Sequence, residues 1–161
     1  MDAATCRQQL ARLIADETRF LNELAGLLER EHGALQAEDA VSLEGTSRER
    51  QRCVAAIVRS DEERRALCRT NGRAEDLSGL EDLMRWCDSQ GSLAPGWAQC
   101  SAAAAHCRTL NDRNGALVGA RLKHVRDRLG VLIQGHREGV TYGRRGADAP
   151  PTAGRLIADK A

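Results

Sequence analysis

The chain has 161 residues, of which 42% are apolar and 29% charged, and its four aromatic side chains are Phe20, Trp86, Trp97 and Tyr142. Four rings are too few for a β-sandwich core or an aromatic-lined active site, and the abundance of alanine, leucine, arginine and glutamate is typical of long helices. The formal charge is +1, but residues 1–50 carry 6 basic and 10 acidic groups whereas residues 111–161 carry 10 and 5. Composition therefore predicts an all-α protein with a basic C-terminal end.

A first helix is predicted over residues 3–36, where apolar side chains alternate at spacings of four and three. Polar Glu17 and Glu31 interrupt this seam, and a second apolar row repeats every seven residues. The two rows are Leu10, Ile14, Leu21, Leu24, Leu28 and Leu35, and Leu13, Phe20, Leu27 and Ala34. Such a stripe is wide enough to face two neighbouring helices, which predicts an elongated, left-handed antiparallel four-helix bundle.

A second helix is predicted over residues 40–69, and Thr70, Asn71 and Gly72 give its stop signal. Its apolar content is thinner, with polar residues at intervening seam positions: Ser47, Arg50, Asp61 and Arg64. A third, shorter helix is predicted over residues 74–90, and a turn containing Pro95 follows it. The second and third helices thus differ in length by more than ten residues.

The fourth helix is predicted over residues 95–134. Asn111 and Asn114 lie near its seam, where polar residues either set the register or face solvent. Gly115 and Gly119 need an explanation, because glycine inside a helix costs about 1 kcal/mol relative to alanine. Close approach of a neighbouring helix and a hinge are the two candidates.

Helical periodicity ends near Gly135, so we expect a helical domain over residues 1–135 and a mobile C-terminal tail over residues 136–161. The tail contains Tyr142, its one aromatic residue. A lone tyrosine outside any core is a plausible docking handle.

The sequence contains no recognisable catalytic machinery. His32, His106, His124 and His136 lack the H-E-x-x-H spacing, no serine lies in G-x-S-x-G, and there is no P-loop. The six cysteines form no C-x-x-C pair and fit small core positions on helices. We therefore predict no enzyme activity, no cofactor and no metal. Without a long apolar run or a signal peptide, we expect a cytoplasmic protein.

Two classes of non-enzymatic protein stay open besides one that binds a partner through an apolar surface. The basic residues between Arg121 and Arg145 could attract nucleic acid electrostatically, although no aromatic stacking platform accompanies them. A coiled-coil homo-oligomer is the other alternative, because an apolar face can pair with a second copy of itself.

Unequal helix lengths point to a binding surface. At 1.5 Å per residue the third helix spans about 25 Å and the fourth about 60 Å, so the later half of the fourth helix lacks one neighbour. An apolar groove or ridge results, and an incoming amphipathic helix would gain about 1.5–3 kcal/mol for each large side chain buried. The predicted binding residues are Leu117, Val118, Leu122, Val125, Leu129, Leu132 and Ile133.

Three groups of residues in the C-terminal half form a recognisable pattern: Asn111, Asn114 and Gly115 with the apolar residues around them, Leu129, Leu132 and Gly135, and Thr141, Tyr142, Gly143 and Gly146. This pattern resembles the C-terminal signature of the FlgN family of flagellar export chaperones. The chain length and the helical N-terminal pattern also fit this family, so the resemblance covers nearly the whole chain.

The resemblance implies a four-helix bundle that binds the hook–filament junction proteins FlgK and FlgL, keeps them unassembled and delivers them to the flagellar type III export apparatus. It implies that client binding maps onto the segment from Leu117 to Ile133. It also implies that Tyr142 contacts the export gate.

Overall fold

The computed structural model describes residues 1–140, with side chains described as far as residue 130. Four helices and no strand make up this part of the chain, which confirms the predicted all-helical fold: α1 (Ala3–Ala37), α2 (Ala40–Thr70), α3 (Leu77–Cys87) and α4 (Ala94–Val140). The chain divides into two units, one covering Met1–Arg121 and one beginning at Leu122, and the boundary lies within α4. No described helix is long and apolar enough to cross a membrane.

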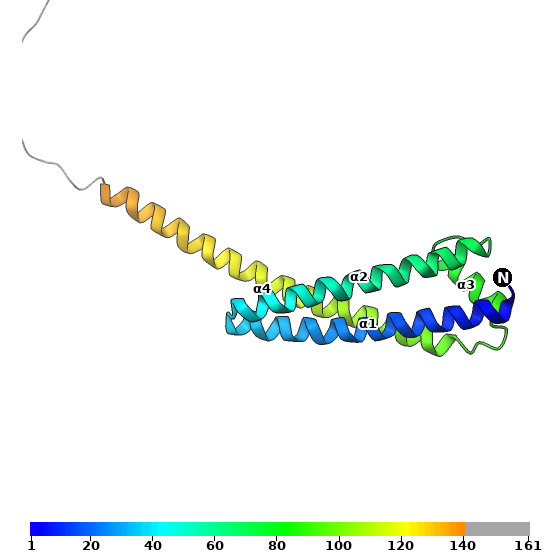
Figure 1. Cartoon of the computed structure of the whole chain (residues 1–161). Coiled ribbons are helices and arrows are strands. Elements are labelled where there is room, and N and C mark those ends of the chain that lie inside the picture. The colour runs from blue at the N-terminus through cyan, green and yellow to red at the C-terminus, as the bar shows by residue number, and fades with distance from the viewer. Residues whose placement is uncertain (141–161) are drawn as a thin grey trace, which may run out of the picture. The chain divides into compact units, whose positions relative to one another are not determined.

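In the first unit α2 folds back along α1 after a short connection (Figure 1). The connection is stable because Glu38 adopts a left-handed conformation with φ of 59° and the Asp39 carboxylate accepts hydrogen bonds from the N–H groups of Val41 and Ser42, each at 3.1 Å. Ion pairs then link the two helices along their length. Arg12 near the start of α1 pairs with Glu63 near the end of α2, and Arg30 near the end of α1 pairs with Glu49 near the start of α2.

The polar residues that interrupt the seam of α1 meet polar seam residues of α2. Arg64 Nε lies 3.6 Å from Glu17 Oε2, and Arg50 Nη1 lies 3.0 Å from Glu31 Oε1. Burial raises the pKa of the Glu17 carboxyl, although the charge of Arg64 acts in the opposite direction. Because a shift in register would leave these partly buried charges unpaired, the two pairs help to define how α1 and α2 align.

The apolar core draws residues from all four helices, and α3 covers it at the end of the first unit near the N-terminus (Figure 1). All six cysteines are buried and none forms a disulfide. Burial raises the pKa of the Cys6 thiol to about 12, so this side chain packs as a small neutral group. The clustered core residues are Cys6, Leu10, Leu13, Ile14, Leu21, Leu28, Leu67, Cys68, Leu80, Leu83, Cys87, Leu93, Cys100, Cys107 and Leu110.

The third helix is shorter than the predicted span of 74–90. It begins only at Leu77 because the Asp76 carboxylate caps it, accepting a hydrogen bond from Gly79 N at 2.8 Å. The preceding backbone lies directly over this first turn: a Cβ on Gly79 would come within 2.0 Å of the Ala74 carbonyl oxygen. Ala74 is therefore part of the connection and not of the helix.

The fourth helix is longer than predicted and ends at Val140 instead of 134, so residues 136–140, which the sequence assigns to the tail, are helical. The turn before α4 is held by Asp88, whose carboxylate accepts hydrogen bonds from Leu93 N and Ser92 Oγ, each at 2.7 Å. These bonds lower the pKa of Asp88. Residues 141–161, including Tyr142, lie outside the described residues.

Candidate functional site

The first part of α4 packs on α1 through a regular seam of buried residues. Cys100, Cys107, Leu110 and Asn114 are all at most 6% exposed. Two side chains of this seam donate hydrogen bonds to carbonyl oxygens of α1, Cys107 Sγ to Leu21 O at 3.1 Å and Asn114 Nδ2 to Leu28 O at 2.8 Å. From residue 115 to residue 130 no side chain of α4 is buried. The seam therefore ends at Asn114, although the helix continues.

Asn114 closes this seam with a polar layer that joins three helices. Its Nδ2 group also lies 3.2 Å from Glu31 Oε2, and its Oδ1 atom lies 3.0 Å from His32 Nδ1. Glu31 in turn accepts hydrogen bonds from Arg50 of α2. Asn114 is 3% exposed and every polar atom of its amide has a partner, which is the arrangement expected of a residue that sets register. Asn111, the other candidate, is exposed.

The sequence shows this layer only in part. Glu31, Arg50 and Asn114 are each polar residues at or near an apolar seam, but the pattern within any one helix does not pair them. The signal that pairs them is the coincidence of polar interruptions on neighbouring helices.

Two arginines of α4, one before Asn114 and one after it, contact the C-terminal part of α1 and the residue that follows it. Arg113 Nη2 lies 2.8 Å from Glu29 Oε2. Arg121 Nη2 donates to the Gln36 carbonyl oxygen at 3.4 Å and lies 3.5 Å from Glu38 Oε1. A guanidinium at these last carbonyls of α1 also complements the negative end of the helix dipole. Arg121 is the last residue of the first unit.

Gly115 and Gly119 are exposed, and a Cβ on either would meet no atom of another residue within 4 Å among the described residues. The expectation that close approach of a neighbouring helix explains these glycines is therefore wrong for the described structure. A hinge stays a prediction.

Beyond the seam, large apolar side chains of α4 are exposed. In the first unit Leu117 is half-buried and Val118 is 41% exposed. In the second unit Leu122, Val125 and Leu129 are 52%, 52% and 51% exposed, and we call these three residues the α4 stripe. Leu132 and Ile133 lie on the helical backbone of α4, but their side chains lie outside the described ones.

The α4 stripe is a row of exposed apolar side chains along one helix. Every residue from Leu122 to Gly130 is exposed. The spacings of three and four within the stripe keep its side chains on one face. The opposite face is polar, with Lys123, His124 and Asp127. An exposed apolar row rimmed by polar residues is typical of a protein-interaction surface.

The described residues thus define a helical protein with a close-packed core unit and a long last helix on which apolar side chains are exposed. A model of the FlgN family, described as FlgN protein, matches residues 1–150. The chain belongs to the FlgN family, which is a family of flagellar export chaperones. No curated protein and no solved structure matches the chain.

Proposed function

We propose that this chain is a cytoplasmic chaperone for the hook–filament junction proteins FlgK and FlgL. It binds the C-terminal helical regions of these clients, prevents their premature assembly and delivers them to the flagellar type III export apparatus. Membership of the FlgN family supports the chaperone role. One observation supports the position of the binding site. Asn114 is buried and no side chain from residue 115 to residue 130 is, although α4 continues to Val140.

In this proposal the client helix lies along the later part of α4. The binding residues are Leu117, Val118, Leu122, Val125, Leu129, Leu132 and Ile133. A half-exposed leucine or valine still has apolar surface to remove from water, and burying such surface is worth about 25 cal/mol per Å² before ordering costs. Several such side chains together supply enough free energy for specific binding without any catalytic group.

Two further parts of the proposal concern the whole chain. Tyr142 contacts the export gate, and this residue is separate from the client site in sequence. The helices of the first unit form a left-handed antiparallel bundle, and the way α2 folds back along α1 supports the antiparallel part of this arrangement (Figure 1).

The test is to place a charge in the middle of the α4 stripe. Val125→Asp and Leu129→Asp should abolish co-purification with a C-terminal fragment of FlgK or FlgL, because burying an unpaired carboxylate against the client is costly. Both residues are about half exposed in the free chain, so helicity by circular dichroism and mass by light scattering should stay unchanged.

Ala120→Asp is the matched control. Ala120 is exposed and lies on the face of α4 opposite the stripe, so the same new charge there should leave client binding intact. Undiminished binding by Val125→Asp would contradict the proposed site, and loss of helicity in that variant would show that Val125 belongs to a core. A mass near twice 17.5 kDa without client would instead favour the homo-oligomer.

A further inference from the structure

The α4 stripe has the spacing of one strand of a two-helix coiled coil. Leu122, Val125 and Leu129 follow one another at intervals of three and four, and all three are exposed. When two such helices pair, the residues on either side of the apolar seam meet the corresponding residues of the partner. The charges at those flanking positions therefore select which helix can pair.

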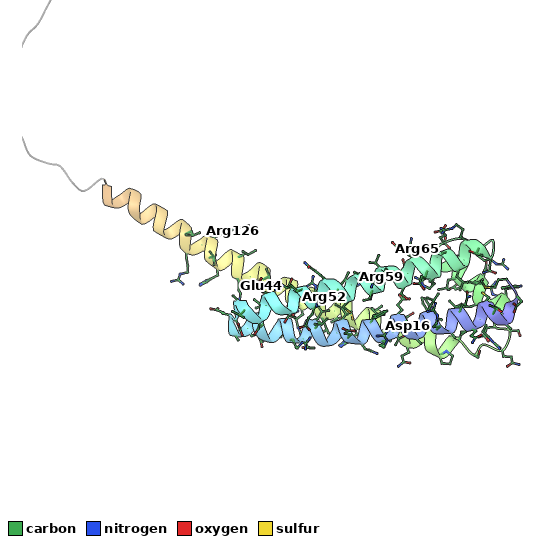
Figure 2. The ribbon with its side chains drawn as sticks, viewed as in Figure 1. Asp16, Glu44, Arg52, Arg59, Arg65 and Arg126 are labelled. Atoms are coloured by element: carbon green, nitrogen blue, oxygen red, sulfur yellow. The ribbon has the colours of Figure 1, made fainter. Side chains whose placement is uncertain are left out.

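Both flanks of the α4 stripe are occupied by arginine. Arg126 follows Val125 on one side and Arg128 precedes Leu129 on the other, and both are exposed (Figure 2 labels Arg126 on α4). The single acidic residue of this segment, Asp127, lies on the opposite face and cannot offset them across the seam. Arg121, one heptad before Arg128, already pairs with Glu38 in the first unit.

This pattern disfavours a second copy of the same helix. In an antiparallel pair Arg126 and Arg128 would each face an arginine of the other copy, and in a parallel pair Arg121 would face Arg126. Like charges at these positions lower the affinity, whereas carboxylates there would form ion pairs across the seam.

We propose that the α4 stripe accepts an amphipathic helix of another protein whose residues flanking the apolar seam are Asp or Glu. This inference rests on the proposed function and specifies the chemistry of its partner. The apolar residues of the stripe supply the contact area, and Arg126 and Arg128 select against basic helices and against self-pairing.

Two synthetic helical peptides of about four heptads test the proposal on the full chain. They share the same leucine and valine seam and differ only in having glutamate or lysine at every flanking position. We expect the glutamate peptide to bind about tenfold more tightly at low ionic strength, since several exposed charge pairs change sign together. The difference should shrink as salt is added.

Charge reversal on the protein gives the second readout. Arg126→Glu/Arg128→Glu should reverse the preference and favour the lysine peptide. Lys123→Glu is the control for charge reversal in this segment, because it reverses one basic residue on the polar face, and it should keep the preference for glutamate.

Equal binding of the two peptides, or a preference that persists in Arg126→Glu/Arg128→Glu, would overturn the proposal. So would a dimer of the free chain that Val125→Asp dissociates. These results are distinct from failure of the proposed function: if both peptides bind equally and Val125→Asp abolishes both, the apolar docking site stands and only its selection by charge is lost. If Val125→Asp leaves capture of the FlgK fragment unchanged, the client site itself is wrong.

Discussion

At the scale of single residues, the most informative position is Asn114. A buried amide is costly unless its polar atoms find partners, and Asn114 finds them on Leu28, Glu31 and His32 of α1. The same bonds place the end of the α4 seam beside the Glu31–Arg50 pair. Asn114 therefore fixes the register of α4 on α1, and no side chain from residue 115 to residue 130 is buried after it.

Replacing Asn114 tests how much its buried hydrogen bonds contribute to stability, with an exposed asparagine of the same helix as the control for helix propensity. Asn114→Ala should lower the free energy of unfolding by about 1–2 kcal/mol relative to Asn111→Ala, as measured by urea denaturation. Both variants gain the same helix propensity, but Asn111 is exposed and loses no buried hydrogen bond. Equal stability of the two variants would show that the Asn114 contacts contribute nothing to folding.

At the scale of helices, the sequence predicted the number and type of elements because their apolar periodicity is strong. It misplaced the start of the third helix, since Leu77 begins it only by virtue of a cap at Asp76 and a backbone crossing at Ala74 that depends on tertiary contacts. It also placed the end of the fourth helix too early, because Gly135 reads locally as a stop although the helix continues to Val140.

The candidate site was predictable in part for the same reason. Spacing alone places Leu122, Val125 and Leu129 on one face, but it cannot show that Asn114 is the last buried residue of α4 before residue 130. Helix lengths favour either a groove with one wall missing or a ridge, and within the second unit every residue from Leu122 to Gly130 is exposed.

Two glycine variants test the helix boundaries. Gly79→Ala should destabilise the protein by about 1–3 kcal/mol, because the new Cβ would collide with the Ala74 carbonyl oxygen. Gly115→Ala adds the same methyl group where nothing lies within 4 Å, and it should stabilise α4 by up to about 1 kcal/mol. Thermal unfolding followed by circular dichroism measures both. A stabilised Gly79→Ala variant would mean that the segment before α3 does not cross the helix as described.

At the scale of the whole molecule, stability and binding are assigned to different stretches of one chain. Residues before Asn114 supply the core, the buried thiols and most of the paired charges, whereas residues 115–130 include exposed apolar side chains with arginines beside them. Along the sequence the first 50 residues carry 6 basic and 10 acidic groups, whereas the last 51 carry 10 and 5.

Hydrogen–deuterium exchange of the full chain, with and without a C-terminal fragment of FlgK, tests the central claim most directly. In the free chain the amides from Val118 to Gly130 should exchange faster than those of α1, because no side chain in that part of α4 is buried, and we expect the same of residues 131–133 in the proposed site. Client binding should slow exchange across this segment and leave α1 and α2 little changed. Protection confined to α1 and α2, with residues 118–133 still exchanging rapidly in the complex, would contradict the account.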